Sequence, residues 1–543
     1  MKIALAQLDL VVGDLKGNRE RILSALEEAI QQGARVCVTP ELSLLGYPAL
    51  DLLDRPDILA RSDLELQSLV DSTRGKKCAL IVGHLSPGSH AQKLMNSLSV
   101  IDDGKIVYTQ SKILLPTYDV FDESRYFESG SQPKLWDCDG SKVAFLICED
   151  LWGEDTRSGG HRYSRDPVAE VTKLKPDFLI AIAASPFEKE KVSIREELHQ
   201  HAARKISSPL FYVNQTGAND EVLFDGRSFV INALGEKCVS LPAFESKTVT
   251  VDTHQLMPIR QKPPSEMEVL ALGLVSGIRS YFNRTGFKKA LIGLSGGIDS
   301  AIVASLAVRA LGKESVLGVT MPSQYSSDHS LQDADTLAKN LGITLENQEI
   351  QSVFTKVQSQ IGKSRDGLSQ LSQENLQSRI RGLFLMSISN HENRLVITTG
   401  NKSEIAMGYC TMYGDMVGAI APIGDLYKTE VYALSRWVNE NWGSPIPERS
   451  ITKAPSAELR PNQTDQDTLP PYEKLDPVLK SYLEDGVSLD QLALSHGEWV
   501  RGVIRTVEIS EYKRRQSAPA LKTSAKAFGI GRRIPVAKIW DQK

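Results

Sequence analysis

The sequence predicts an α/β fold in two parts, and three features of the chain lead to this prediction. Short apolar runs of strand length alternate with amphipathic stretches of helical period along both halves. A proline-rich segment without apolar periodicity, residues 253–266, separates the halves and is typical of a linker. In the second half, an apolar run leads through a Ser-Gly-Gly turn into a helical pattern, as in a parallel βα unit. We therefore expect one domain over residues 1–252 and another over residues 267–543.

The composition narrows the class of protein and its compartment. The 543 residues are enough for two or more domains that each bury a core. The 41% hydrophobic and 24% charged residues are those of an ordinary soluble globular protein, and a net charge of −4 argues against a nucleic-acid partner. No apolar run reaches the ~18 residues that a membrane span needs, and the chain opens on a strand pattern instead of a signal peptide. We expect a cytoplasmic protein without a membrane partner.

Six cysteines are dispersed along the chain without any C-x-x-C pair: Cys37, Cys78, Cys138, Cys148, Cys238 and Cys410. This spacing argues against both a disulfide framework and a zinc site. Cysteine chemistry in this chain is therefore expected to be that of a single thiol.

The N-terminal half alternates strands with helical stretches. An amphipathic helix is expected at residues 18–32. Strands are expected at residues 2–8, 34–38, 78–83, 98–101, 143–147, 178–183, 210–214, 228–232 and 247–251. Alternation of this kind predicts a layered α/β domain.

Three polar residues follow apolar segments in this half, namely Glu41, Lys112 and Cys148. Side chains placed after such strands meet at a common edge of a sheet. A thiolate, a carboxylate base and an ammonium that stabilises an oxyanion together suit acyl transfer from an amide. Singly, each residue also fits a structural role: a core cysteine, a turn carboxylate and a surface lysine.

The motifs around these residues resemble those of the nitrilase and carbon-nitrogen hydrolase superfamily. They are P-E-L-x-x-x-G-Y-P, K-x-x-L-P-x-Y-x-V-F-D-E-x-R-Y-F and C-E-D-x-W. The resemblance covers residues 1–251 and implies an α-β-β-α sandwich. It implies that Glu41 is the general base, Lys112 the oxyanion residue and Cys148 the nucleophile, with Glu123 as a second carboxylate.

The resemblance extends to the glutaminase domains of NAD synthetases. There, the positions of Tyr118, Ser185 and Lys191 contact glutamine. Many members read S-P-x-x-x-G-K, whereas this chain has Glu190 in place of the glycine. This departure leaves Arg195 as the alternative to Lys191.

The C-terminal half predicts a doubly wound parallel sheet. Strands are expected at residues 290–292, 316–320, 343–350 and 395–399, and helices at 268–285, after the glycine turn, at 327–341 and at 375–389. The turn brings backbone amides and a helix N-terminus close to a ligand, which suits a pyrophosphate. Asp299 is a hard oxygen ligand suited to Mg²⁺. Because no Gly-Lys-Ser/Thr follows, we expect a nucleotide that is cut between its α- and β-phosphates.

The string S-G-G-I-D-S resembles the loop of the N-type ATP pyrophosphatases, whose fold is adenine nucleotide alpha hydrolase-like. The alternative is a structural βα turn. The resemblance implies that ATP is a co-substrate and that Mg²⁺ is held by Asp299 and Glu404. It places the following residues at ATP: Gly293, Leu294, Ser295, Gly296, Gly297, Ile298, Asp299, Ser300, Thr399 and Lys428.

Further motifs are similar to those of NAD synthetases. They are E-N-L-Q-S-R-I-R at residues 374–381, T-T-G-N-K-S-E at 398–404, and E-Y-K-R-R at 511–515. The resemblance places Asn375, Arg379, Glu404 and Lys513 at deamido-NAD⁺. Residues 453–472 form an irregular stretch that we expect to be a mobile loop over the site.

A nitrilase-like half followed by S-G-G-I-D-S resembles the family of glutamine-dependent NAD⁺ synthetases over nearly the whole chain. The family hydrolyses L-glutamine and passes the ammonia, through an expected tunnel, to adenylated deamido-NAD⁺. The resemblance also implies a homo-oligomer. Two alternatives are an RNA-modifying enzyme, which would be expected to show a basic surface and paired cysteines, and an amidase whose second half only binds nucleotide.

Overall fold

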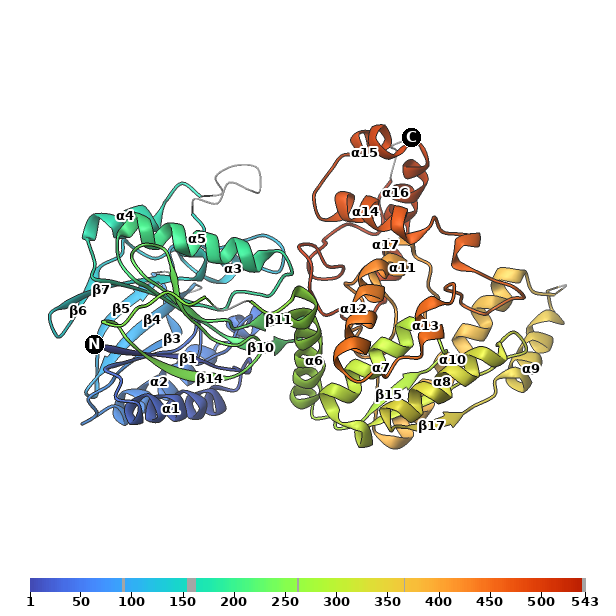
Figure 1. Cartoon of the computed structure of the whole chain (residues 1–543), viewed down its shortest axis with the longest axis horizontal. Helices are drawn as coiled ribbons and strands as arrows, with labels where there is room; N and C mark the ends of the chain where they lie inside the picture. Colours follow the sequence, from blue (N-terminus) through green and yellow to red (C-terminus); the bar gives the residue numbers. More distant parts are fainter. Residues whose placement is uncertain (90–92, 154–162, 261–262, 366, 540–543) are drawn as a thin grey trace. The chain divides into compact units, whose positions relative to one another are not determined.

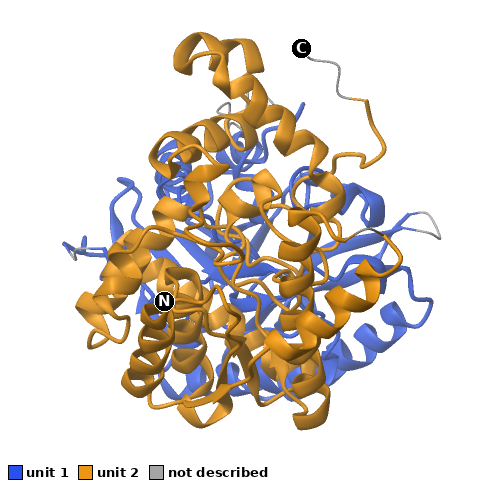
Figure 2. Ribbon diagram, turned by 90° about the vertical axis from the view of Figure 1, so that its right-hand side faces the viewer, with its two compact units in different colours: residues 1–264 blue, residues 265–543 orange. Residues whose placement is uncertain are grey.

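The computed structural model describes residues 1–89, 93–153, 163–260, 263–365 and 367–539. The chain divides into two compact units, Met1–Pro264 and Ser265–Lys543 (Figures 1 and 2). Gln261 and Lys262, in the expected linker, lie outside the described residues.

The first unit contains two six-stranded sheets. The first sheet has the order β14-β1-β2-β3-β4-β5 and is mixed, with β1, β2 and β3 parallel. Its strands are β1 (Lys2–Gln7), β2 (Val36–Val38), β3 (Ala79–Pro87), β4 (Leu94–Asp102), β5 (Lys105–Ser111) and β14 (Lys247–Asp252). The antiparallel pairing of β14 with β1 returns the end of the unit to its beginning.

The second sheet has the order β13-β12-β9-β8-β7-β6, with β7, β8 and β9 parallel. Its strands are β6 (Leu135–Cys138), β7 (Ser141–Ile147), β8 (Phe178–Ala183), β9 (Leu210–Asn214), β12 (Phe229–Ile231) and β13 (Lys237–Ser240). A separate hairpin joins β10 (Thr216–Asn219) to β11 (Val222–Asp225).

Helices cover the outer faces of the two sheets. Figure 1 shows α1 (Leu15–Gln31) and α2 (Ile58–Ser72) along one outer face, with α4 (Pro167–Leu174) and α5 (Lys191–Ile206) along the other. The shorter elements are η1 (Leu50–Asp54), α3 (Glu123–Tyr126) and η2 (Cys148–Leu151). Between the sheets, side chains of β1, β2, β7, β8 and β9 share one buried core. This arrangement confirms the predicted α-β-β-α sandwich.

The second unit is built on a four-stranded parallel sheet with the order β17-β16-β15-β18. The strands are β15 (Ala290–Gly293), β16 (Val316–Thr320), β17 (Thr344–Asn347) and β18 (Leu395–Val396). From β15 the chain moves outward to β16 and β17 and then returns to β18 on the other side of β15. The order therefore reverses at β15, and ligand sites of doubly wound sheets lie at this point of reversal.

Helices surround this sheet and continue beyond it. Those connected with the sheet are α6 (Glu266–Thr285), α7 (Ile298–Leu311), α8 (Asp328–Leu341), α9 (Gln351–Gly362) and α10 (Gln370–Glu392). The others are α11 (Lys402–Met407), α12 (Lys428–Asn441), α13 (Glu448–Thr452), α14 (Tyr472–Leu483), α15 (Leu489–His496), α16 (Trp499–Ile509) and α17 (Glu511–Arg514), with short turns η3 (Lys313–Ser315) and η4 (Asp465–Asp467). Helices α14, α15 and α16 form a second small core with α11.

Some sequence expectations in this unit were too broad. The strand expected at 343–350 is only four residues long, and the one expected at 395–399 pairs as a strand over two residues. In α10, the helical period predicts an apolar stripe of Leu376, Ile380, Leu383 and Phe384, but Leu383 is 59% exposed, whereas Leu385 is buried. Ile380 is buried in a small core against which Leu376 and Phe384 pack, so the expectation is wrong for Leu383 alone.

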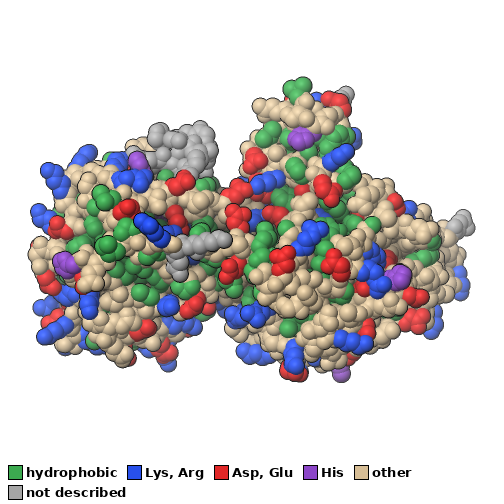
Figure 3. Space-filling model, viewed as in Figure 1, with side chains coloured by type: hydrophobic (Ala, Val, Ile, Leu, Met, Phe, Trp, Pro, Cys, Tyr) green, Lys and Arg blue, Asp and Glu red, His purple; other side chains and the backbone are tan. Residues whose placement is uncertain are grey.

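Among the described residues, none of the helices combines the length and the apolar composition required for membrane crossing. On the face seen in Figure 3, basic side chains are interspersed with acidic ones, so this face presents charges of both signs.

Candidate active sites

The first candidate site lies where three strands of the Met1–Pro264 unit end. Glu41 follows β2, Lys112 follows β5 and Cys148 follows β7. Lys112 Nζ lies 2.7 Å from Glu41 Oε1, and the charges of both residues act on the Cys148 thiol. The structure therefore brings together the three residues that the sequence singles out as base, oxyanion group and nucleophile.

The backbone at Cys148 is strained and is held by a buried carboxylate. Cys148 has φ of +47°, in the left-handed region that a residue with a Cβ rarely adopts. Asp150 accepts hydrogen bonds of 2.8 to 3.0 Å from the backbone N–H groups of Ile113, Leu114 and Ile147. Burial raises the pKa of Asp150 to about 7 against the effect of these donors. The three bonds tie the cysteine turn to the segment that carries the lysine.

A second carboxylate, Glu123, shares the lysine. Lys112 Nζ and Tyr47 Oη both donate to Glu123 Oε1, at 2.7 Å and 2.8 Å. Burial raises the pKa of Glu123 to about 7, although the Lys112 ammonium opposes this change. Burial would lower the pKa of Lys112, but the carboxylates of Glu123 and Glu41 outweigh it and raise that pKa well above its ordinary value. Lys112 therefore remains a cation between two buried carboxyl groups.

The nucleophile needs a base. Burial raises the pKa of the Cys148 thiol well above its ordinary value; the Glu41 charge raises it further, and Lys112 opposes them. The resting thiol is therefore protonated near neutral pH. Since the thiolate is the attacking species, its formation has to be coupled to proton transfer to a neighbouring group, and Glu41 is the carboxylate suited to this.

The residues expected at glutamine lie around this cluster. Tyr118 Oη donates to the Glu149 carboxylate at 3.0 Å. The Ser185 N–H donates to Asn214 Oδ1 at 2.8 Å. Lys191 Nζ lies over two aromatic rings, 5.4 Å from the Phe121 centroid and 5.3 Å from the Trp152 centroid.

Arg195, the alternative to Lys191, is engaged elsewhere. Its guanidinium makes two hydrogen bonds to the Asp225 carboxylate, at 3.0 Å and 2.6 Å, and the residue is 2% exposed. An arginine held in this buried pair is not available to a substrate carboxylate, so the geometry favours Lys191.

Sequence reasoning missed several groups that hold Glu41 and its neighbours. Asn96 Nδ2 donates to Glu41 Oε1 at 2.7 Å, and the Ala184 N–H donates to Glu41 Oε2 at 2.8 Å. Tyr47 belongs to the P-E-L-x-x-x-G-Y-P motif, which could have indicated it. Asn96 lies inside a strand, where a single polar residue has no distinguishing pattern.

The second candidate site is a cavity of about 310 Å³ in the Ser265–Lys543 unit. Its walls include these residues expected at ATP: Gly293, Leu294, Ser295, Gly297, Ile298, Asp299, Ser300, Thr399 and Lys428. Gly296 lies in the same turn, with φ of +75°, but not among the lining residues. A Cβ at Gly296 would stand 2.2 Å from the Ser330 carbonyl oxygen, so this turn and α8 approach too closely for any other residue.

Two carboxylates and a lysine meet in the lining of this cavity. Lys428 Nζ donates to Asp299 Oδ2 at 2.5 Å and to Glu404 Oε1 at 3.2 Å. Asn401 Nδ2 donates to Asp299 Oδ1 at 3.0 Å, and Asn401 also caps the helix that carries Glu404. Burial raises the pKa of Glu404 to about 8, and the Lys428 ammonium opposes this shift. Asp299 follows β15 and Glu404 follows β18, so the strand order explains why they meet.

This donor set fits a magnesium ion. Mg²⁺ is usually held by one or two carboxylates, with substrate phosphates and waters completing its shell. Asp299 and Glu404 supply two carboxylates at one cavity wall, and a cation there would remove the unfavourable burial of the Glu404 charge. Lys428, expected as a phosphate contact, instead pairs with both carboxylates.

The remaining residues expected at deamido-NAD⁺ lie around the segment 408–412. Asn375 Oδ1 accepts a hydrogen bond from Thr411 Oγ1 at 2.9 Å. The exposed Arg379 donates through Nε to the Met412 carbonyl at 3.2 Å. Lys513 Nζ donates to the carbonyls of Gly408 and Cys410, at 2.6 Å and 2.9 Å. None of the three is among the lining residues of the cavity, although Glu404 is.

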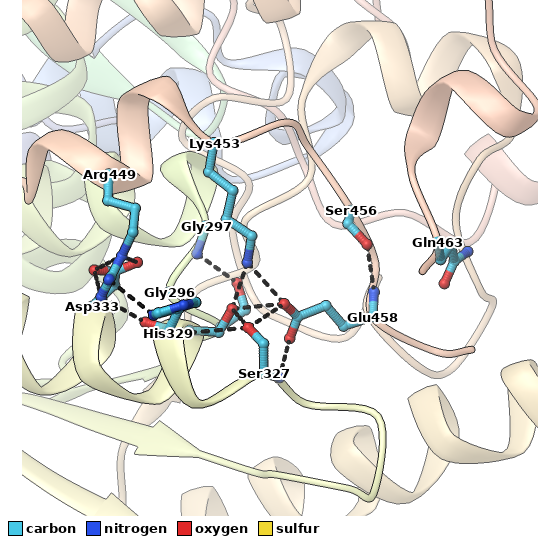
Figure 4. Close-up of polar contacts among 12 residues, drawn as sticks. Gly296, Gly297, Ser327, His329, Asp333, Arg449, Lys453, Ser456, Glu458 and Gln463 are labelled. Atoms are coloured by element: carbon cyan, nitrogen blue, oxygen red, sulfur yellow. Dashed lines mark hydrogen bonds and ion pairs between the residues drawn. The ribbon is translucent and has the colours of Figure 1, made fainter. Parts of the chain in front are cut away.

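The stretch expected to be a mobile loop, residues 453–472, is held at its start by a half-buried cluster of polar side chains (Figure 4). Glu458 accepts hydrogen bonds from Lys453 Nζ at 2.8 Å, from Ser330 Oγ at 2.7 Å and from Ser327 Oγ at 3.0 Å. Ser327 is the N-cap of α8. Beside this cluster, Arg449 pairs with Asp333 at 2.7 Å. Residues 453–459 also line the cavity, so the loop forms part of its wall.

Comparisons with known proteins agree over the whole chain. The carbon-nitrogen hydrolase family matches residues 2–258, and the NAD synthase family matches residues 271–517. A glutamine-dependent NAD(+) synthetase from Synechocystis is 42% identical over 99% of this chain and 98% of its own length. One from Thermotoga maritima is 38% identical over 99% and 98%.

Solved structures give the same result. A glutamine-dependent NAD⁺ synthetase from Acinetobacter baumannii, in complex with ADP, is 35% identical with a TM-score of 0.78 over 98% of both chains. One from Cytophaga hutchinsonii, 20% identical, shows the same fold with a TM-score of 0.83 over 99% of this chain and 98% of that chain. The two matched families, the full-length relatives and the two sites agree: the chain belongs to the family of glutamine-dependent NAD(+) synthetases.

Proposed function

We propose that this enzyme hydrolyses L-glutamine to glutamate and ammonia at the Cys148 site and uses the ammonia to convert deamido-NAD⁺ to NAD⁺ at the ATP site. The observation that carries the proposal is the presence of two separate reaction centres in one chain. One is the buried Glu41–Lys112–Cys148 cluster. The other is the cavity in which Asp299, Glu404 and Lys428 adjoin the glycine turn.

In the first reaction, Glu41 accepts the Cys148 thiol proton as sulfur attacks the side-chain carbonyl carbon of glutamine. The oxyanion that forms is stabilised by the Lys112 ammonium. The C–N bond then breaks, and Glu41 returns the proton to nitrogen. Ammonia departs, and the γ-glutamyl group stays on Cys148 as a thioester. Water, deprotonated by Glu41, hydrolyses the thioester, and the thiol recovers its proton as glutamate leaves.

Tyr118, Ser185 and Lys191 bind glutamine in this proposal. Lys191 is the cation among them, and its position over Phe121 and Trp152 keeps the ammonium near an apolar wall. Such a position suits a partner for the substrate carboxylate.

In the second reaction, the nicotinate carboxylate of deamido-NAD⁺ attacks the α-phosphorus of ATP, and pyrophosphate leaves. The carbonyl carbon of this acyl adenylate has a good leaving group, AMP, so ammonia attacks that carbon, AMP leaves and the amide forms. The turn from Ser295 to Ser300, with Thr399, is proposed to hold the ATP phosphates. Asn375, Arg379, Glu404 and Lys513 are proposed to hold the dinucleotide.

Mg²⁺ is the proposed metal, held by Asp299 and Glu404, where it would neutralise charge on the phosphates. A reduced thiol and the use of ATP favour the cytoplasm as the compartment. The homo-oligomeric state and the ammonia tunnel stay predictions from the family resemblance.

The test is whether glutamine hydrolysis depends on the second reaction. Glutamate and NAD⁺ are measured with glutamine, Mg-ATP and deamido-NAD⁺ present, and again with each omitted. A coupled synthetase produces both products in near-equal amounts and slows glutamate release when deamido-NAD⁺ is absent. Rapid glutamate release with no NAD⁺ in any mixture would instead indicate an amidase whose second half only binds nucleotide.

A further inference from the structure

We infer that Asn96 is a positioning residue of the glutaminase site, which keeps Glu41 in its ionised, proton-accepting form beside Cys148. The inference rests on the proposed glutamine hydrolysis and adds a residue to it. Asn96 lies in β4, is 1% exposed and belongs to none of the motifs quoted for the site.

Asn96 contacts both charged members of the cluster. Its side-chain Nδ2 donates to Glu41 Oε1 at 2.7 Å, and its backbone carbonyl accepts the Lys112 N–H at 2.8 Å. The side chain and the main chain of one residue therefore set the positions of the base and of the lysine segment together.

Glu41 is surrounded by donors. Oε1 accepts from Asn96 Nδ2 and Lys112 Nζ, both at 2.7 Å, and Oε2 accepts from the Ala184 N–H at 2.8 Å. An ionised carboxylate can accept all three bonds, whereas a protonated carboxyl group has to give up acceptor capacity. These donors favour the charged form, which is the form that can take the thiol proton.

The orientation of the Asn96 amide follows from the same contacts. If the amide were turned over, its carbonyl oxygen would face Glu41 Oε1 at the same distance, and two acceptors would meet. In the observed orientation Oδ1 is buried and has no hydrogen-bond partner among the described residues. A buried carbonyl without a partner costs free energy, and leucine, which has a similar size, would avoid that cost. The amide thus serves Glu41 and not the packing of the strand.

Other titratable groups also face Glu41. They are Lys112, Glu123, Tyr47 and Cys148. Since Lys112 is shared between Glu41 and Glu123, its charge is not available to Glu41 alone. Among the donors to Glu41, the Asn96 amide is a neutral side chain and the Ala184 N–H is a neutral backbone group.

Two variants test the inference, Asn96→Leu and Asn96→Asp. In Asn96→Leu, kcat/KM for glutamine-driven NAD⁺ formation is expected to fall about 10- to 100-fold. The acid limb, which is the part of the pH profile of kcat/KM that falls at low pH, is expected to move up by about one pH unit. In Asn96→Asp, a protonated aspartic acid can still donate to Glu41. This variant is expected to retain activity at low pH and to lose it as the pH rises, because two carboxylates then face each other.

Gln110→Leu is the matched control. Gln110 is another buried amide, in the neighbouring strand β5, and it donates to the Phe145 carbonyl instead of to Glu41. Its loss is expected to lower thermal stability without moving the acid limb. For every variant, NAD⁺ formation from ammonium chloride and the melting temperature report whether the protein is folded.

Opposite pH trends in the two Asn96 variants, with ammonia-driven synthesis intact, support the inference. It is overturned if both variants show the wild-type pH profile, or lose glutamine-driven activity equally at all pH values as a purely structural change would. Failure of the proposed function looks different, because wild-type protein would then form no NAD⁺ from glutamine at any pH.

Discussion

Lys428 shows most clearly how single residues link the fold to the chemistry. It begins α12 and is 1% exposed, and the resemblance to ATP pyrophosphatases places it at ATP. Its ammonium instead joins Asp299 and Glu404, and these carboxylates raise its pKa against the lowering effect of burial. The lysine therefore compensates the charges of two carboxylates.

Replacing Lys428 by Met is expected to reduce NAD⁺ formation from both nitrogen donors by about 100-fold, since the carboxylates lose their common counter-charge. Lys339→Met is the control: Lys339 pairs with Asp335 on the surface of α8 and its side chain is 74% exposed. Steady-state rates with glutamine and with ammonium chloride measure both variants. Equal rates for Lys428→Met and wild type would show that this lysine has no part in the second reaction.

Some residues could be predicted from the sequence and others could not, for a physical reason. Cys148, Glu41 and Lys112 follow apolar strand patterns and stand in motifs, so their meeting was foreseeable. Asn96 lies within a strand and acts through a contact 55 positions away in the sequence. A contact of that kind depends on sheet register, which no local pattern records.

At the scale of elements, long apolar runs were predictable and short polar ones were not. The strands β8, β9 and β16 have the bounds that their continuous apolar runs predict. The hairpin of β10 and β11 was missed; β10 reads Thr-Gly-Ala-Asn, which has no apolar run. Tertiary contacts, and not propensity, make such segments strands.

The turn between β15 and α7 allows a direct test of backbone geometry. Gly296→Ala would place a Cβ against the backbone of Ser330 at a positive φ, and is expected to lower NAD⁺ formation from both donors at least about 100-fold, since the turn cannot keep its shape. Gly502→Ala, in α16, meets no atom within 4 Å and is expected to stabilise the protein by about 0.5–1 kcal/mol. Rates and melting temperatures check both. Normal synthesis by Gly296→Ala would contradict the role of this turn.

The loop that begins at Lys453 is the second element to test. Glu458 has a left-handed backbone, and Lys453, Ser330 and Ser327 lower the pKa of its carboxyl against the effect of burial. Glu458→Gln is expected to loosen residues 453–465, raise their amide hydrogen exchange and increase KM for ATP several-fold. Arg460→Gln, at a half-exposed pair with Asp467, is the control. Unchanged exchange in the Glu458 variant would mean that other contacts hold the loop.

At the scale of the whole chain, the buried His84 is expected to make the first unit sensitive to acid. His84 is 4% exposed, and burial lowers its pKa to about 4 against the backbone hydrogen bond to Leu85. In the unfolded chain a histidine has a pKa near 6.5, so between about pH 6.5 and 4 the unfolded state binds more protons and stability is lost as pH falls. Over this pH range, protonation of His84 in the unfolded state lowers the free energy of unfolding by about 3 kcal/mol in total.

Between pH 6.5 and 4, the free energy of unfolding of His84→Gln is therefore expected to decrease less steeply than that of wild type. This expectation does not depend on the stability of the variant at pH 7. Denaturant unfolding at several pH values measures this slope. The exposed His254→Gln is the control and should keep the wild-type slope. A His84 variant with an unchanged slope would show that this histidine does not contribute to acid sensitivity.

If the two units carry separate reactions, the Cys148 thiol serves only the glutamine reaction. NAD⁺ formation from deamido-NAD⁺ and Mg-ATP should be measured with glutamine and with ammonium chloride, in wild type and in Cys148→Ala. We expect the variant to lose glutamine-driven synthesis and to keep the ammonia-driven reaction near the wild-type rate. Glutamine-driven synthesis that survives in Cys148→Ala, or wild-type protein that forms no NAD⁺ from either donor, would contradict this expectation.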